Sequence, residues 1–141
     1  MWTEDRILKN VFMFLLGGFL YYFLEIAVRG YSHYSMIICG GLAFLLSGLL
    51  NQVLGFQVAL VSQMVLSACM ITGLEFFTGL IVNVWLEMDV WDYSDVPYNL
   101  MGQICLPYSM LWMVLSLACI FLDDWIRYRL FGEEKATYKI F

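Results

Sequence analysis

Charged side chains are scarce in this sequence. Asp, Glu, Lys and Arg make up 13% of the 141 residues, whereas 62% are hydrophobic. A soluble domain carries about 25% charged residues, so this composition excludes an ordinary soluble fold and indicates an integral membrane protein. The length suits one domain without a separate soluble module. The few basic residues form no patch, and we therefore predict no nucleic-acid partner.

Several chemical motifs are also missing. The only histidine is His33, and the four cysteines lie in apolar runs without a CxxC pair. We therefore predict no metal site and no cofactor. The chain has no GxxxxGK[ST] motif, so an ATP-driven process would need a separate ATPase chain. It also has no GxSxG or HExxH motif, and the sequence gives no catalytic assignment.

Long apolar runs dominate what is present. A spanning helix needs roughly 20 mostly apolar residues, and four segments qualify: 7–28, 35–54, 58–85 and 99–122. Their short connections predict an all-α, up-down-up-down bundle of four transmembrane helices, forming a single domain over 1–141. We expect 123–141 to be a cytoplasmic tail at the membrane interface.

Two spans have features of their own. The third is longer than the membrane requires, which predicts tilt or a break near Thr72 and Gly73. Pro107 falls inside the fourth span, and since proline cannot donate to the preceding turn, we predict a kink there.

The basic residues predict the orientation. Arg29 is alone on one side of the predicted bundle. The other side holds Arg6, Lys9, Arg127, Arg129, Lys135 and Lys139. By the positive-inside rule, both termini are cytoplasmic and the acidic loop after residue 85 faces outward, in the cell membrane.

Two glutamates, Glu25 and Glu75, lie inside apolar helices. A carboxylate at membrane depth is costly and normally faces protein or a wet cavity. Glu25 can pair with Arg29 at i,i+4, while Glu75 has no cation on its own helix, which leaves Arg29, His33 or a proton as partners.

Polar groups gather at the same predicted side of the membrane as the two glutamates. The candidate substrate-binding cavity comprises Glu25, Arg29, His33, Glu75, Asn83, Trp91, Asp92, Ser94, Asn99 and Gln103. The alternative is that the glutamates only lock the bundle together, Glu25 through Arg29 and Glu75 through hydroxyls and amides.

Two further patterns concern helix packing. Gly41 and Gly48 share a helix face, which predicts a close helix contact. Leu24-Glu25 with Gly30 is loosely repeated by Leu74-Glu75 with Gly79, which favours two related helical hairpins as an internal repeat.

The same motifs carry a family resemblance. Gly17-Gly18, Tyr22, Leu24-Glu25, Arg29-Gly30 and Ser32-Met36 are followed by Leu74-Glu75-Phe76, Thr78-Gly79, Asn83, Trp91-Ser94, Asn99, Gly102-Cys105 and Trp112. This ordered set, over roughly 10–127, resembles the ABC-transporter permease (type IV) family of small multi-pass bacterial membrane proteins, which also has animal relatives. The resemblance implies a transport role.

Three functions remain open from the sequence. The first is a transport component with an outward-facing polar cavity for a small polar or cationic solute. The others are a non-catalytic partner or regulatory subunit of a membrane complex, and a membrane-embedded enzyme acting on a lipid headgroup. Four spans make a thin permease, so besides the lipid bilayer we expect a homo-oligomer, with a dimer favoured, or a partner membrane subunit.

Overall fold

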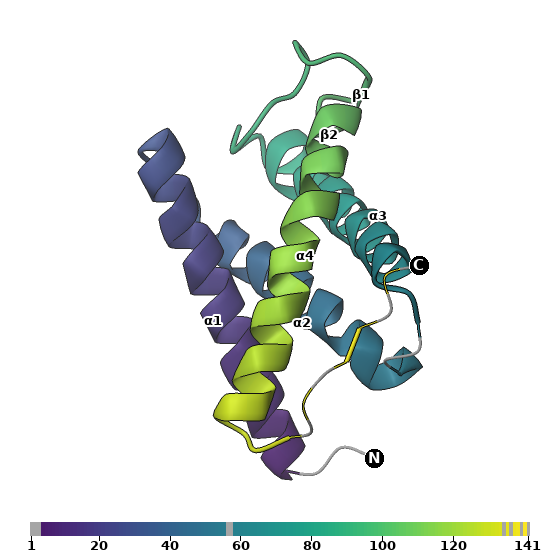
Figure 1. Ribbon diagram of the computed structural model, residues 1–141. Coiled ribbons are helices and arrows are strands. Elements are labelled where there is room, and N and C mark those ends of the chain that lie inside the picture. The colour runs from purple at the N-terminus through teal and green to yellow at the C-terminus, as the bar shows by residue number, and fades with distance from the viewer. Residues whose placement is uncertain (1–3, 56–57, 134, 136, 139, 141) are drawn as a thin grey trace.

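Four helices make up most of the computed structural model, which describes residues 4–55, 58–133, 135, 137–138 and 140. In chain order the elements are α1 (Glu4–Arg29), α2 (Ser35–Leu54), α3 (Leu60–Gly79), the π-helix η1 (Leu80–Trp85), β1 (Asn99–Leu100), β2 (Ile104–Cys105) and α4 (Leu106–Arg129) (Figure 1). The two short strands pair antiparallel, with Asn99 opposite Cys105. The predicted all-α, four-helix architecture is confirmed.

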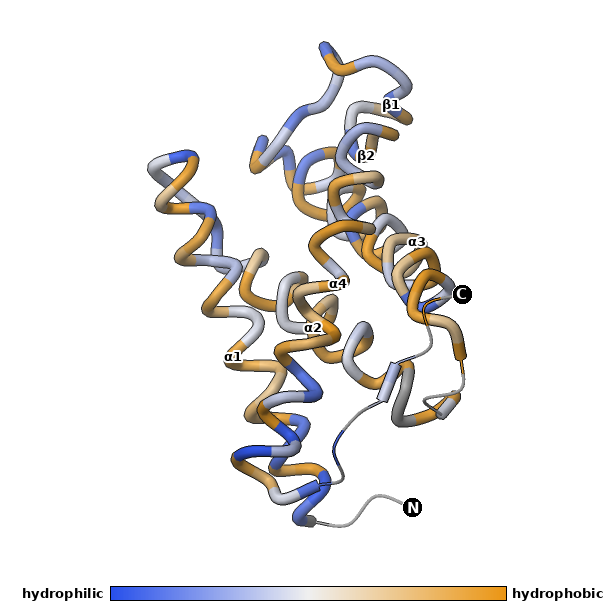
Figure 2. The backbone as a smooth tube through the Cα atoms, in the orientation of Figure 1, coloured by the Kyte–Doolittle hydropathy of each residue, from blue (hydrophilic) through white to orange (hydrophobic). Residues whose placement is uncertain are grey.

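Three helices are long and apolar enough to cross a membrane: Asp5–Arg29, Leu60–Trp85 and Leu106–Arg129. α2 contributes a shorter apolar stretch, Ser35–Leu50, so its span over 35–54 stays a prediction. Hydrophobic colours dominate the middle of the bundle, and hydrophilic residues gather in the loop at one end and around the first turns of α1 (Figure 2). Large apolar side chains such as Leu8, Phe23 and Phe77 are more than 60% exposed, as expected of surfaces that face lipid.

The fourth helix differs from its predicted span. It begins at Leu106 instead of Asn99, because the preceding residues form the β1–β2 hairpin. Pro107 therefore lies in the first helical turn, where an amide needs no intrahelical acceptor, and the predicted kink is wrong. The helix continues to Arg129, which absorbs the first part of the predicted tail. Lys139, used to predict the orientation, lies outside the described residues.

The third helix is not broken near Thr72 and Gly73, where the sequence predicted a tilt or a break, so the tilt alone stays a prediction. α3 instead continues as a π-helix, in which the Leu86 amide donates to the Ile81 carbonyl at 2.9 Å. Turns of this kind often occur at functional sites. Here the π-helix carries Asn83, whose side chain holds the loop that follows.

Glycines bring α1 and α2 into backbone contact. A Cβ atom on Gly41 would lie 2.6 Å from the Phe14 carbonyl oxygen, and one on Gly18 would overlap the Ile37 carbonyl oxygen. Small residues allow such close approach of membrane helices. Gly48 is also tightly packed, but against the Asp123 side chain of α4. Gly41 and Gly48 thus contact different helices, although they were predicted to share one contact face.

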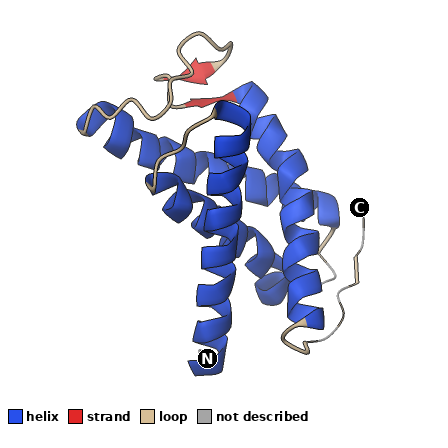
Figure 3. Ribbon diagram, turned by 90° about the vertical axis from the view of Figure 1, so that its left-hand side faces the viewer, coloured by secondary structure: helices blue, strands red, loops and turns tan. Residues whose placement is uncertain are grey.

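α2 contacts each of the other helices, and the most extensive contacts are between α1 and α2 and between α3 and α4. The start of α1 and the end of α4 meet at one end of the bundle, and the strands lie at the other (Figure 3). Arg127 of α4 donates there to Asn10 of α1 at 3.0 Å and pairs with Asp123 at 2.7 Å. The two predicted hairpins are thus neighbours in space, while a symmetry axis between them stays a prediction.

Candidate functional site

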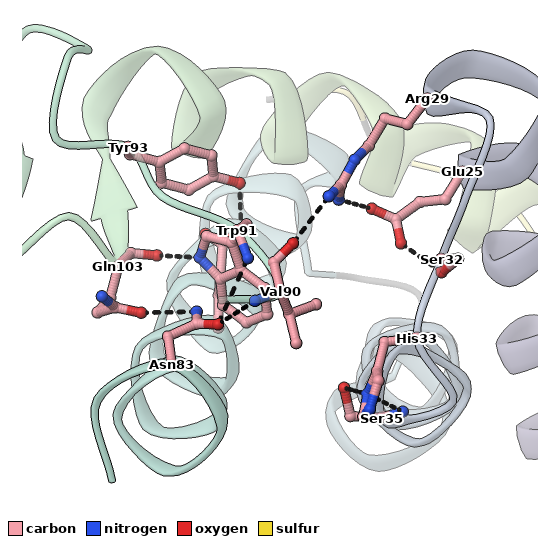
Figure 4. Close-up of polar contacts among 11 residues, drawn as sticks. Glu25, Arg29, Ser32, His33, Ser35, Asn83, Val90, Trp91, Tyr93 and Gln103 are labelled. Carbon is pink, nitrogen blue, oxygen red and sulfur yellow. Dashed lines mark hydrogen bonds and ion pairs between the residues drawn. The ribbon is translucent and has the colours of Figure 1, made fainter. Parts of the chain in front are cut away.

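The end of α1 carries an ion pair that is tied to a distant loop. Arg29 Nη1 donates to Glu25 Oε2 at 2.7 Å, as predicted from the i,i+4 spacing. Ser32 Oγ donates to the other oxygen of Glu25 at 2.6 Å. Arg29 Nη2 donates to the Val90 carbonyl oxygen at 2.8 Å, which joins α1 to the loop after η1 (Figure 4). Glu25 therefore has a neutralising partner within its own helix.

Glu75 lies on α3 and is held by neutral donors. Tyr93 Oη donates to its Oε2 at 2.8 Å, and Trp112 Nε1 of α4 donates to its Oε1 at 3.2 Å. Only 7% of Glu75 is exposed. Among the described ion pairs none involves Glu75. Arg29, His33 or a proton were predicted as its partners, or hydroxyls and amides if it only locks the bundle, but Tyr93 and Trp112 were not identified as the donors.

Asn83 organises the loop above the helices. Its side-chain oxygen accepts from the Val90 amide at 2.6 Å and from the Trp91 amide at 3.4 Å, and its nitrogen donates to Gln103 Oε1 at 2.8 Å. Trp91 Nε1 in turn donates to the Gln103 carbonyl oxygen at 2.9 Å (Figure 4). Asn83 and Gln103 thereby position Val90 for Arg29 and Trp91 beside the helices.

We expect Asn83→Leu to loosen this loop. It removes three hydrogen bonds, and each buried polar group left unsatisfied costs about 1–3 kcal/mol. Hydrogen exchange at the Val90 and Trp91 amides should accelerate by roughly 10- to 100-fold. Mass spectrometry of the protein in lipid nanodiscs measures this.

Asn99→Leu is the control, because among the described residues the Asn99 side chain bonds to Ser94, Val96 and Gly102 of its own turn. Its effect should be confined to that turn. Unchanged exchange at Val90 in Asn83→Leu would contradict the assigned role of Asn83.

Four predicted site residues make local contacts away from Glu75. Ser94 donates to Asp92 Oδ1 through both its amide and its hydroxyl, and these bonds lower the pKa of Asp92. Asn99 donates to the Ser94 carbonyl in the same exposed turn. His33 Nδ1 accepts from the Ser35 amide at 3.1 Å and lies 2.7 Å from its hydroxyl, at the start of α2. These contacts shape turns and bring no further group to Glu75.

A cavity of about 230 Å³ extends between α1 and α4, with walls from α2, α3 and the loop. Glu25, Arg29, Glu75 and Trp91 of the predicted set line it. His33, Asn83, Asp92, Ser94, Asn99 and Gln103 do not belong to its lining. The remaining wall is mostly apolar, in contrast to the polar cavity predicted from the sequence. The role of these residues in substrate binding stays a prediction.

Three aromatic side chains that were not among the predicted site residues line the cavity near Glu25, Arg29 and Glu75, which form its charged end. Tyr21, Tyr93 and Trp112 line it, and the rings of Tyr21 and Trp112 meet edge-on at 6.3 Å between α1 and α4. Burial, and then the charge of Glu75, raise the pKa of Tyr93, so its hydroxyl remains a donor to that carboxylate. In the described part of the chain, no three His, Cys, Asp or Glu residues could hold a metal ion.

Three long apolar helices, lipid-suited exposed surfaces and a partly charged internal cavity define a multi-pass membrane protein. Residues 8–139 match a family described as "Putative ABC-transporter type IV". The chain belongs to this family, which confirms the resemblance noted from its motifs. No curated protein and no solved structure matches the sequence.

Proposed function

We propose that this chain is a membrane-spanning component of a transporter, with the cavity between α1 and α4 as its ligand site. The supporting observation is that all four helices and the loop build a single cavity that has Glu25, Arg29 and Glu75 among its lining residues. Family membership supports the same role. Binding pockets commonly combine an apolar wall with a few convergent polar groups, which is the arrangement here.

A purely structural role explains Glu75 less well than Glu25. Glu25 has its arginine, whereas the donors to Glu75 among the described residues are neutral, and Glu75 borders a cavity. A buried carboxylate without a cation is a costly way to fasten two helices. The enzyme alternative would need catalytic groups to converge, but His33 bonds to Ser35 and Asp92 to Ser94, in separate turns.

The predicted orientation and the lack of an ATP-binding motif indicate how the chain would fit into a complete transporter. The charged end of the cavity faces outward, and the joined ends of α1 and α4 face the cytoplasm. Because the chain has no ATP-binding motif, an ATPase would be a separate subunit. A homodimer, or a pairing with another membrane subunit, would supply the further helices that a complete pathway needs.

Native cysteines provide a test of water access to the cavity. Cys39 lines the cavity, whereas Cys69 is exposed on α3 and lies outside the lining. In single-cysteine variants, with the other cysteines replaced by alanine, a membrane-impermeant methanethiosulfonate should modify Cys39 faster than Cys69, because the reagent reaches a thiol only through water and we expect lipid to cover the exposed surface of α3. Labelling of oriented vesicles, read by mass spectrometry, measures both rates.

The membrane face from which the reagent modifies Cys39 shows to which side the cavity opens. Reaction of Cys39 from the outer face alone agrees with a resting state open to the outside. Reaction no faster than that of Cys69, from either face, would show that the cavity holds no water path and would remove the basis of the transport proposal.

A further inference from the structure

Among the described residues, the lining of the cavity has two carboxylates, Glu25 and Glu75, and one cation, Arg29. We propose, on the basis of the transport role above, that the cavity binds a small amphiphilic organic cation. Its positive group would lie beside Glu75, among Tyr21, Tyr93 and Trp112, and its apolar part would extend between α1 and α4.

The charges lining the cavity support a monocation. Arg29 is already engaged by Glu25 at 2.7 Å and by the Val90 carbonyl at 2.8 Å, and it lies over the Tyr31 ring. The positive charge of Arg29 is therefore already balanced by Glu25. Within the described part of the chain, the hydrogen bonds to Glu75 come from an indole and a phenol. One bound positive charge would balance the carboxylates against the cations of the lining.

The aromatic side chains around Glu75 suit an organic ammonium group. Tyr93 stacks on Tyr108 with ring centroids 4.8 Å apart, and Tyr108 lies 6.2 Å from Trp112. With Tyr21 against Trp112, these rings form a continuous aromatic cluster beside the carboxylate. Aromatic faces attract alkylammonium groups through the ring quadrupole, most strongly where water is excluded.

The remainder of the wall excludes a bare metal ion as the main ligand. Below the charged end, the lining is largely aliphatic and aromatic, with Leu20, Phe44, Leu115 and Leu122 along the helices. Such a surface offers no oxygen ligands to replace the water shell of a hard cation. It can instead cover an alkyl or aryl tail. Since ligand pockets usually measure about 300–1,000 Å³, a cavity of about 230 Å³ calls for a small molecule.

Three probes of similar shape and different charge test this inference. They are benzyltrimethylammonium, its neutral carbon analogue neopentylbenzene, and phenylmethanesulfonate. Binding to the protein in nanodiscs is measured by calorimetry and by the fluorescence of its tryptophans, with empty discs subtracted. We expect the cation to bind about tenfold or more tightly than the neutral probe, and the anion to bind weakest.

Variants place the preference at Glu75. Glu75→Gln keeps the size of the side chain and should reduce the preference for the cation by about tenfold or more. The matched control Glu87→Gln changes an exposed loop glutamate and should leave binding unaltered. Equal affinity for the charged and neutral probes in the unaltered protein would overturn the inference, even if Glu75→Gln failed to fold. So would no binding of any probe, or a preference that survives Glu75→Gln.

Two further experiments distinguish the source of the bound cation and separate ligand binding from transport. Nanodiscs with and without phosphatidylcholine distinguish the quaternary ammonium of a zwitterionic lipid headgroup, which would compete with the probe, from a free cation. Proteoliposome uptake separates this inference from the transport proposal. Charge-selective binding without uptake would retain the ligand class and reject transport, whereas uptake without charge preference would do the reverse.

Discussion

Gly18→Ala is expected to destabilise the protein by about 1–3 kcal/mol or more, because the added methyl group would overlap the Ile37 carbonyl oxygen. The obstacle is backbone, which cannot rotate away as a side chain can. α1 and α2 would have to separate, and the contact between Gly41 and Phe14 would loosen with them. Equilibrium unfolding in mixed detergent micelles measures the change in the free energy of unfolding.

Gly73→Ala is a matched control, because a Cβ atom on Gly73 has nothing within 4 Å. In a helix interior, alanine is favoured over glycine by about 1 kcal/mol, so this variant should be neutral or slightly stabilised. If Gly18→Ala behaved like Gly73→Ala, the close backbone packing of α1 on α2 would be refuted.

Arg127→Met should have an even larger effect. Arg127 is 5% exposed and Asp123 is fully buried, with 2.7 Å between Arg127 Nε and Asp123 Oδ1. Removal of one partner from a buried pair costs about 3–5 kcal/mol, because the remaining charge is left without compensation. Loss of the 3.0 Å bond to Asn10 would add to the effect by releasing α1 from α4. The free energy of unfolding and the thermal midpoint should both fall.

The double variant Arg127→Met/Asp123→Leu tests that cause. Since replacement of both members of a buried pair by apolar residues is often neutral, it should recover most of the lost stability. Arg129→Met alters an exposed arginine of the same helix and should stay within about 0.5 kcal/mol of the parent. A double variant as unstable as Arg127→Met would mean that lost packing, and not the orphaned carboxylate, causes the effect.

The sequence contained enough information for the helices and for one ion pair. Apolar runs of sufficient length produce helices in a membrane because every backbone group must be satisfied internally. Helical periodicity alone puts Arg29 one turn from Glu25, and the pair forms as predicted. α2 begins and ends at Ser35 and Leu54, as the pattern predicted, since the residues before it form a short polar turn.

The partners of Glu75 could not be predicted in the same way. Tyr93 is 18 residues away and Trp112 is 37 residues away, so their contacts depend on how the loop folds over the helices and how α3 packs against α4. The start of α4 was also missed, because Pro107 is acceptable either at a kink or in a first turn. Nor did hydropathy reveal that Asp92 and Ser94 satisfy each other in an exposed turn.

The bond from Arg29 to Val90 has an asymmetric consequence. Its acceptor is a main-chain carbonyl, and every amino acid at position 90 supplies one. Natural variation at that site therefore cannot delete the anchor point, whereas a single codon change at Arg29 can. Among the described hydrogen bonds, the link between the first helix and the loop above the bundle therefore depends on the side chain of Arg29.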